Sequence, residues 1–328
     1  MYADTTIADA NKYRRCDMAG DGTVLVTGAT GNIGAGLVPL LVDAGVKVRA
    51  LVRNEAKAQA LQARGADVVV GNLDNAGSVR AAVHGVDKIF LLTWNGLTAP
   101  KQASNVIQAA KRVGSPGIVR LSAYGSPRSR IIRDHSAIDE EIVASGLPFT
   151  FIKPTFFMQN SMMAAQTVAS DGRIYMPFKN GRVGMPDVRD IVDVAAHVLT
   201  TGGHQGREYI VTGPESISFH DVAAALSEAL GKDVQYVNVP LEAGKQAMLG
   251  MGCRNGSQTG TRSSSRTSPT TGATACRPTW RSCSAARHAP SGSSLATSLS
   301  TSKFQPQLDV SPEPVQSKNR RVTSQLQH

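Results

Sequence analysis

The chain has 328 residues and a net charge of +10, and 41% of its residues are hydrophobic. This length allows one large domain or two, and the charge alone would favour a nucleic acid or an anionic membrane as partner. From Cys253 onward, however, about ten Lys and Arg residues stand against two acids. The remaining chain is close to neutral, which argues against a nucleic-acid partner.

The four cysteines all lie outside the central part of the chain, at Cys16, Cys253, Cys276 and Cys283. We therefore expect no disulfide framework and no cysteine-based metal site between residues 18 and 252, and the sequence predicts no bound metal. No apolar run reaches the ~18 residues of a membrane span, and the beginning of the chain lacks the apolar core of a signal peptide. These features predict a soluble, cytoplasmic protein.

Residues 1–21 form a polar leader without hydrophobic periodicity, including Arg14 and Arg15, and we expect this leader to be disordered. Met18 stands just before the first predicted strand and is an alternative start of the protein. A targeting arm is the other interpretation of the leader.

The segment 23–34 predicts a buried parallel strand, a glycine turn and the start of a helix. Gly28 permits a tight turn, Gly31 lets the backbone approach a pyrophosphate, and Gly34 lets the helix pack close to the strand. The spacing is GxxGxxG rather than the usual GxGxxG, and a plain turn without a ligand is the alternative. The predicted phosphate-binding residues are Gly28, Thr30, Gly31, Asn32, Ile33 and Gly34.

The second predicted strand, residues 46–52, ends at Arg53, with Lys57 one turn further on. An acidic residue at this position would bind the ribose 2′-hydroxyl of NAD, whereas a cation suits the 2′-phosphate of NADP. The sequence therefore favours NADP(H) over NAD(H), although NAD(H) stays possible. A solvated basic loop is the alternative interpretation.

Strands and helices continue to alternate along the chain, which predicts an α/β fold with a doubly wound parallel sheet. The predicted strands are 67–70, 88–92, 117–122 and 149–152, and the predicted helices are 55–64, 76–83, 101–113 and 133–145. Ligands of such sheets bind beyond the carboxyl ends of the strands. Further cofactor contacts are therefore expected from Asn72, Leu73, Thr93 and Ser122.

After Pro154 the pattern becomes less regular. We expect a helix over 156–169, a hairpin around 173–178, helices at 187–200 and 218–230, and strands at 208–211 and 234–239. The predicted organisation is a leader (1–21), a cofactor-binding domain (22–154), substrate-domain segments that complete the fold (155–252) and a basic tail (253–328).

Several motifs together resemble the NmrA-like atypical short-chain dehydrogenases, in particular the NAD(P)H:quinone oxidoreductase branch. They are residues 28–34, residues 51–54, His135 with Asp139, and residues 145–154 followed by Phe157 and Asn160. The resemblance covers residues 23–251 and implies a Rossmann domain that binds NADP(H), with a small C-terminal α+β substrate domain. It does not by itself imply catalysis, because some members are redox sensors that regulate transcription.

Standard short-chain dehydrogenases use a Tyr and a Lys one helical turn apart, the Lys lowering the phenol pKa. The one such spacing here, Tyr175 and Lys179, contains Pro177 and is not expected on a helix. His135 and Asp139 occupy the expected place on the predicted helix 133–145, where Asp139 would orient the imidazole or raise its pKa. A purely structural pair is an equal alternative.

The substrate side is assigned to the segment that begins at the end of the predicted strand 149–152. We expect Lys153, where the family often has Arg, to join His135 and Asp139 as a candidate catalytic residue. Phe156, Phe157 and Asn160 are expected to face the nicotinamide and the substrate, with simple core packing as the alternative. The predicted function is NADPH-dependent reduction of a quinone or a similar small electrophile, and the alternative is a non-catalytic NADP(H)-binding redox sensor.

The tail, residues 253–328, lacks the hydrophobic periodicity of the preceding chain. From Cys253 to Leu308 it contains no Asp or Glu, and about two in five of these residues are Ser or Thr. A disordered basic arm is one explanation. The other is a frameshift in a GC-rich gene, because codons allowed from Gly252 onward can spell an acidic, amphipathic helix start in another frame. In that case the substrate pocket of this chain would be incomplete.

Overall fold

The structure of the protein is a computed structural model that describes residues 22–114 and 116–250. The expectations for the leader and for the tail from Cys253 onward lie outside these residues. Within the described ranges, no helix combines the length and the hydrophobicity that crossing a bilayer requires.

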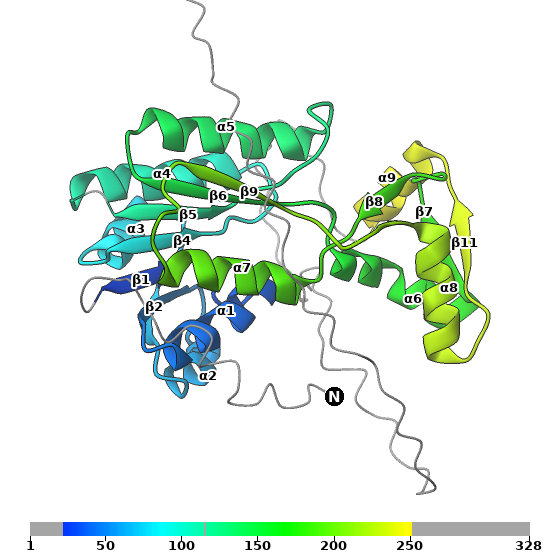
Figure 1. Ribbon diagram of the computed structural model, residues 1–328, viewed down its shortest axis with the longest axis horizontal. Coiled ribbons are helices and arrows are strands. Elements are labelled where there is room, and N and C mark those ends of the chain that lie inside the picture. Colours follow the sequence, from blue (N-terminus) through cyan, green and yellow to red (C-terminus); the bar gives the residue numbers. More distant parts are fainter. Residues whose placement is uncertain (1–21, 115, 251–328) are drawn as a thin grey trace, which may run out of the picture. The chain divides into compact units, whose positions relative to one another are not determined.

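Seven parallel strands form the main sheet in the order β3-β2-β1-β4-β5-β6-β9 (Figure 1). Residues of the central strand are buried on both faces: Val24 and Val26 face one core and Leu25 the other. This explains the continuous apolar runs in the sequence. The strands are β1 (Thr23–Val26), β2 (Lys47–Val52), β3 (Asp67–Val70), β4 (Lys88–Leu91), β5 (Gly117–Leu121), β6 (Phe149–Pro154) and β9 (Arg207–Val211).

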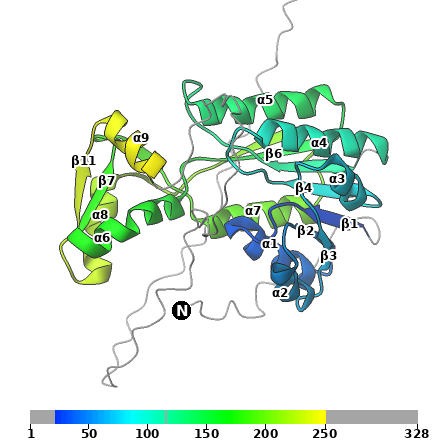
Figure 2. The ribbon, with the colours of Figure 1, turned by 180° about the vertical axis from the view of Figure 1, so that it is seen from behind.

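Helices cover both faces of this sheet (Figures 1 and 2). One face carries α1 (Asn32–Asp43), α2 (Ala58–Gln62) and α7 (Val188–Thr200), and the other carries α3 (Ala76–Val83), α4 (Ala99–Arg112) and α5 (Arg130–Ala144). The predicted doubly wound, Rossmann-type fold is confirmed. The strand order reverses between β1 and β4, which marks where a ligand crevice is expected.

Two elements from beyond Pro154 complete this sheet. Helix α7 packs against α1, and β9 pairs with β6 along Thr150–Pro154. The Asp187 side chain accepts from backbone N–H groups in the first turn of α7, and the Asp190 carboxylate accepts from the Asp187 N–H. This capping box fixes where the helix begins. The predicted helix 187–200 and strand 208–211 are thus present: β9 is a strand of the main sheet, and α7 covers one of its faces.

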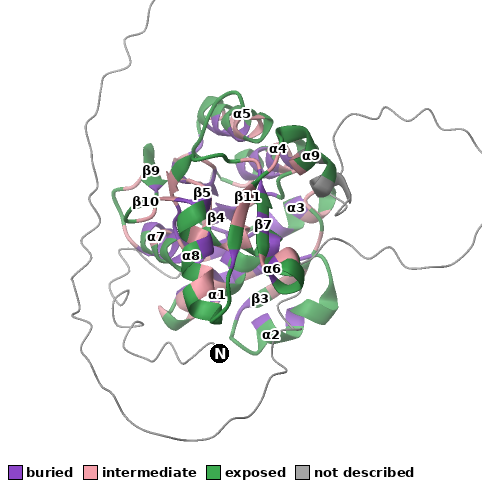
Figure 3. Ribbon diagram, turned by 90° about the vertical axis from the view of Figure 1, so that its right-hand side faces the viewer, coloured by how far each residue is buried: buried purple, intermediate pink, exposed green. Residues whose placement is uncertain are grey.

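The remaining segments form a smaller lobe, residues 155–186 and 212–250, with its own buried core. Figure 3 distinguishes the buried residues of both parts from the exposed outer faces of the helices. A capping box between Ser218 and Asp221 starts α8 as predicted. The lobe comprises α6 (Ala165–Asp171), α8 (Phe219–Leu230), α9 (Leu241–Gly250), β7 (Arg173–Met176), β8 (Arg182–Gly184), β10 (Ser216–Ser218) and β11 (Gln235–Asn238).

The predicted hairpin around residues 173–178 is wrong. Strand β7 pairs in parallel with β11, and β8 pairs antiparallel with β10, so the two strands lie in different sheets. The local signals did mark real boundaries, since Gly172 ends α6 in the left-handed conformation with a φ of 70°. Turn residues indicate where a strand ends, but the partner of β7 arrives some 60 residues later.

The predicted helix 156–169 is only partly correct. Residues Met158–Ala164 form a 3₁₀ helix, and α6 begins at Ala165. Tertiary bonds hold this first part: the Met158 N–H donates to the Pro186 carbonyl, and the Gln159 side chain accepts from the Val188 N–H at 3.0 Å. These contacts override the helical preference of the segment.

Candidate functional site

The turn from β1 into α1, residues 28–34, is where the sequence predicts phosphate binding, and we call it the cradle. Gly28 adopts a φ of 65°, and a Cβ there would meet the Leu92 side chain. A Cβ on Gly34 would meet the Gly28 carbonyl and the Ala29 Cα, so this glycine allows the close strand–helix approach that the sequence predicts. Gly31 has a carbonyl neighbour only, the Gly28 oxygen at 3.3 Å from an added Cβ.

The N-terminus of α1 opens onto this cradle. Its cap residue, Gly31, has no side chain to satisfy the first-turn donors. The N–H groups of Asn32, Ile33 and Gly34 precede the first intrahelical bond and are available to an anion, assisted by the helix dipole. Ile33 itself is buried in the core, so it offers the backbone only, whereas Thr30 and Asn32 are exposed.

Thr27, which the sequence analysis missed, holds the cradle against the next strand. Its hydroxyl donates to the Leu92 carbonyl at 2.9 Å and accepts from the Leu92 N–H at 2.8 Å. The side chain is fully buried. The sequence did contain a signal for this role, because Thr27 is a polar residue between an apolar strand and the glycine turn.

Arg53 follows β2 and is exposed at the same carboxyl edge as Gly28. Asn54 accepts a bond from the Ala56 N–H and starts a 3₁₀ turn at Glu55–Lys57, which places Lys57 just beyond Arg53. Among the described residues, neither cation has an ion-pair or hydrogen-bond partner. Their placement is the one that the 2′-phosphate hypothesis requires.

The other predicted rim residues follow β3, β4 and β5. The Asn72 side chain accepts from the Asp74 N–H at 3.0 Å, and the Leu73 carbonyl accepts from Asn105 at 2.8 Å, so this loop is held in place. Thr93 and Ser122 are almost fully buried. All four follow carboxyl ends of strands, as expected, and their contact with a cofactor stays a prediction.

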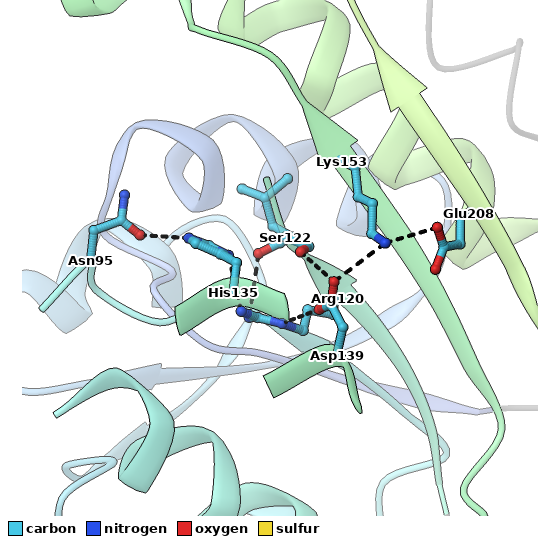
Figure 4. Close-up of polar contacts among 8 residues, drawn as sticks. Asn95, Arg120, Ser122, His135, Asp139, Lys153 and Glu208 are labelled. Atoms are coloured by element: carbon cyan, nitrogen blue, oxygen red, sulfur yellow. Dashed lines mark hydrogen bonds and ion pairs between the residues drawn. The ribbon is translucent and has the colours of Figure 1, made fainter. Parts of the chain in front are cut away.

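A buried ionic network lies below this rim (Figure 4). Arg120 on β5 is 0% exposed and donates from Nε to Oδ1 of Asp139 at 2.9 Å. The Ser122 hydroxyl donates to Oδ2 of Asp139 at 2.6 Å, and Nζ of Lys153 lies 3.5 Å from the same oxygen and 2.8 Å from Glu208. Burial lowers the pKa of Arg120, while the Asp139 carboxylate opposes that shift.

His135 does not form the expected pair with Asp139. Its Nδ1 lies 3.0 Å from Nη2 of Arg120, which stands between the two side chains. Burial first, and the Arg120 cation second, lower the pKa of His135 to about 4. The expectation that Asp139 raises this pKa is therefore wrong. The Asp139 carboxylate is hydrogen-bonded to the Arg120 guanidinium, which lies between it and the imidazole, instead of to the ring.

Arg120, Asn95 and Glu208 are members of the network that the sequence analysis missed. Arg120 carried a signal, since it interrupts an otherwise apolar strand and no buried charge is stable without a partner. Asn95, whose Oδ1 lies 2.8 Å from Nε2 of His135, carried none. Glu208 belongs to β9, whose pairing with β6 brings it to Lys153.

The predicted substrate-side aromatics separate. Phe156 joins the smaller lobe, with its ring 5.4 Å from Phe178 and 6.1 Å from Phe219, whereas Phe157 packs against the main core. Asn160 is half-buried, and its N–H donates to the Phe157 carbonyl. These positions lie on the segment that leaves the main sheet after β6, and their contact with a substrate stays a prediction.

A shallow hollow lies beside the network at the carboxyl edge of β4. Asn95 and His135 contribute to it, together with Arg130 and Asp134, whose charges pair at 2.8 Å. The other lining residues are Thr93, Gly96, Ala99, Ile131 and Ile138.

Known proteins are similar to this chain in sequence and in fold. The chain is 42% identical to the NAD(P)H azoreductase of Xenophilus azovorans over 232 residues, which cover 70% of this chain and 81% of that protein. The NADPH-dependent quinone oxidoreductase of Escherichia coli, solved with NADPH, superimposes with a TM-score of 0.64 at 28% identity, covering 70% of this chain and 83% of the other. The triphenylmethane reductase of Citrobacter sp., solved with NADP(H), gives 0.62 at 27% identity over 70% and 83%.

The predicted resemblance is thereby confirmed. The sequence model described as the NmrA-like family matches residues 20–256, which is most of the chain and includes every candidate site residue. The chain belongs to the NmrA-like family.

Proposed function

We propose that this protein is an NAD(P)H-dependent oxidoreductase that transfers a hydride to a small, electron-poor acceptor such as a quinone. The observation that carries the proposal is the cradle at Gly28–Gly34, which has backbone donors, no side chain in the way and cations at Arg53 and Lys57. The three relatives above, an azoreductase, a quinone oxidoreductase and a triphenylmethane reductase, support the same reaction class.

The residues present fit a dinucleotide. The first-turn N–H groups of α1 would hold the pyrophosphate, and Arg53 would bind the 2′-phosphate and thereby favour NADPH over NADH. When bound, the nicotinamide supplies the hydride. With the adenosine end at β2, the residues after β4 and β5, among them Thr93 and Ser122, would hold the nicotinamide end, because these strands follow β1 in the sheet.

The chain needs to supply little further chemistry. One NADPH, one quinone and one proton give NADP⁺ and a hydroquinone, so the protein has to align the reactants and exclude water. Tyr175 and Lys179 do not replace the usual pair, because Tyr175 lies on β7 and Lys179 in the turn after it, with a φ of 50°. His135 is neutral at pH 7, because burial and Arg120 lower its pKa to about 4, so it would not supply the proton as an imidazolium. The proton would come from bulk solvent once the hydroquinone anion leaves the site.

We assign His135, Asp139 and Lys153 to positioning within the site. The network links side chains of β5, β6, α5 and β9. It would thereby hold these elements in fixed positions beneath the acceptor. Residues 22–154 would bind the cofactor, and residues 155–252 would complete the sheet and cover the acceptor. Phe156, Phe157 and Asn160 would contribute to that covering side.

A turnover assay tests this function. Purified full-length protein is mixed with NADPH and 1,4-naphthoquinone, and the absorbance of NADPH is followed. Steady oxidation that scales with protein concentration supports the reductase. Tight NADPH binding by calorimetry, without consumption in the presence of quinone, favours the redox-sensor alternative instead.

A further inference from the structure

The loop after β4 carries a side-chain amide whose orientation is set by the buried network. Oδ1 of Asn95 lies 2.8 Å from Nε2 of His135, and Nδ1 of the same ring lies 3.0 Å from Nη2 of Arg120. Arg120 is in turn bonded to Asp139 at 2.9 Å. A chain of contacts therefore runs from a buried carboxylate to an exposed residue at the rim (Figure 4).

Hydrogen-bond chemistry fixes every donor in this chain of contacts. A guanidinium only donates, so Nδ1 of His135 must accept, and the ring proton must lie on Nε2. Nε2 therefore donates to Asn95, which must present its oxygen to the ring. The amide nitrogen then points away from His135, as Figure 4 shows.

The amide nitrogen has no hydrogen-bond partner in the part of the chain that the structure describes. Asn95 lines the hollow beside β4, where the charges of Arg130 and Asp134 are paired with each other at 2.8 Å. The hollow thus presents an uncharged donor held at its edge. The Asn95 side chain is exposed, but its oxygen is held by His135. It has therefore already lost much of the rotational freedom that binding a ligand would otherwise remove.

We propose that the side-chain amide of Asn95 donates a hydrogen bond to the acceptor oxygen that becomes negative as the hydride arrives. The inference rests on the proposed function, which places the acceptor over β4 and β5. A donor fixed before the reaction stabilises developing charge without having to reorganise. Arg120, His135 and Asp139 are then positioning residues that hold this donor.

A binding experiment without NADPH tests the contact directly. In a ¹⁵N–¹H spectrum of the full chain, the Asn95 side-chain pair is assigned by its loss in Asn95→Asp. Titration with 1,4-naphthoquinone should shift this pair more than that of Gln102, a nearby amide already bonded to Asp74 at 3.0 Å. Saturable shifts elsewhere at the rim that leave the Asn95 pair unmoved would overturn the proposal.

Kinetics distinguish this donor from a structural role. We expect Asn95→Ala and Asn95→Asp to lower kcat/KM for naphthoquinone roughly tenfold or more, because each removes the donor. A cationic triphenylmethane dye accepts the hydride at carbon and develops no oxyanion, so its kcat/KM should change far less. The control Gln102→Ala should change kcat/KM for neither acceptor. All three variants should bind NADPH with the Kd of the wild type.

Equal losses with quinone and dye, or no loss with quinone, would overturn the donor assignment while leaving the reductase intact. A wild-type protein that consumes NADPH with neither acceptor would instead overturn the proposed function, and this inference with it.

Discussion

The surroundings of His135 disfavour the second ring proton, the one that would make the imidazole a cation. Burial and Arg120 lower its pKa to about 4 from an ordinary value of 6.5. Between these two pH values the unfolded chain binds a proton that the folded chain does not, so stability falls as the pH decreases from 6.5 to 4. Above pH 6.5 and below pH 4 this contribution stays constant.

A substitution that keeps the hydrogen bond but removes the titration tests this argument. In His135→Asn the amide oxygen can still accept from Arg120. Urea unfolding at pH 7 and at pH 4 should show the wild type losing up to about 3 kcal/mol more than the variant. His220→Asn, at an exposed position, serves as the control and should follow the wild type. Parallel curves for wild type and His135→Asn would contradict the assigned neutral ring.

Arg53 is the residue on which the cofactor preference depends. Arg53→Ala should weaken NADPH binding roughly tenfold or more and leave NADH binding nearly unchanged, because only NADPH carries the 2′-phosphate. Calorimetry with both nucleotides measures the two affinities. Arg64→Ala removes an exposed cation elsewhere on the same connection and should not change their ratio. An unchanged ratio in Arg53→Ala would assign this arginine to a solvated loop.

At the scale of elements, the contact between β1 and α1 decides whether the cradle forms. Gly34→Ala would push a methyl group against the Gly28 carbonyl and Ala29, both backbone. We expect a loss of about 1–3 kcal/mol in unfolding free energy and a marked loss of NADPH affinity. Gly202→Ala, where an added Cβ meets nothing within 4 Å, is the matched control. Equal unfolding free energies for the two variants would contradict this expectation, because they would show that α1 can shift away from the Gly28–Ala29 backbone at no cost in stability.

Elements whose signals are local are the ones that the sequence predicts well. Strand β3 and helix α3 match the predicted 67–70 and 76–83, because an apolar run with turn residues, or an Asn75 cap, lies within the segment itself. The partners of β7 and β8 are set by distant segments, so no local pattern contains them. Arg120 and Asn95 escaped detection for the same reason, since each matters through contacts formed only in the folded chain.

At the scale of the whole molecule, the family match ends at residue 256 of a chain of 328. The composition changes at nearly the same place, since no Asp or Glu occurs from Cys253 to Leu308 and the hydrophobic periodicity ends. This coincidence supports the frameshift hypothesis for the region from Gly252 onward. The coding DNA tests it: an alternative frame after Met251 that encodes an acidic, amphipathic helix start is expected, and its absence would assign the tail to the protein proper.

Nucleotide binding should not depend on the residues beyond the family match. The cradle, Arg53 and the rim residues up to Ser122 all follow strands of the main sheet, whose last strand in the chain ends at Val211. A chain that ends at residue 256 should therefore bind NADPH with the affinity of the full chain, measured by calorimetry, and unfold at the same temperature. The deletion also removes most of the basic tail. Any nucleic-acid binding by the full chain should therefore weaken steeply with salt, and it should be absent from the truncated chain. A loss of NADPH affinity as large as that of Arg53→Ala, in a truncated chain that still unfolds cooperatively, would show that the tail takes part in the cofactor site.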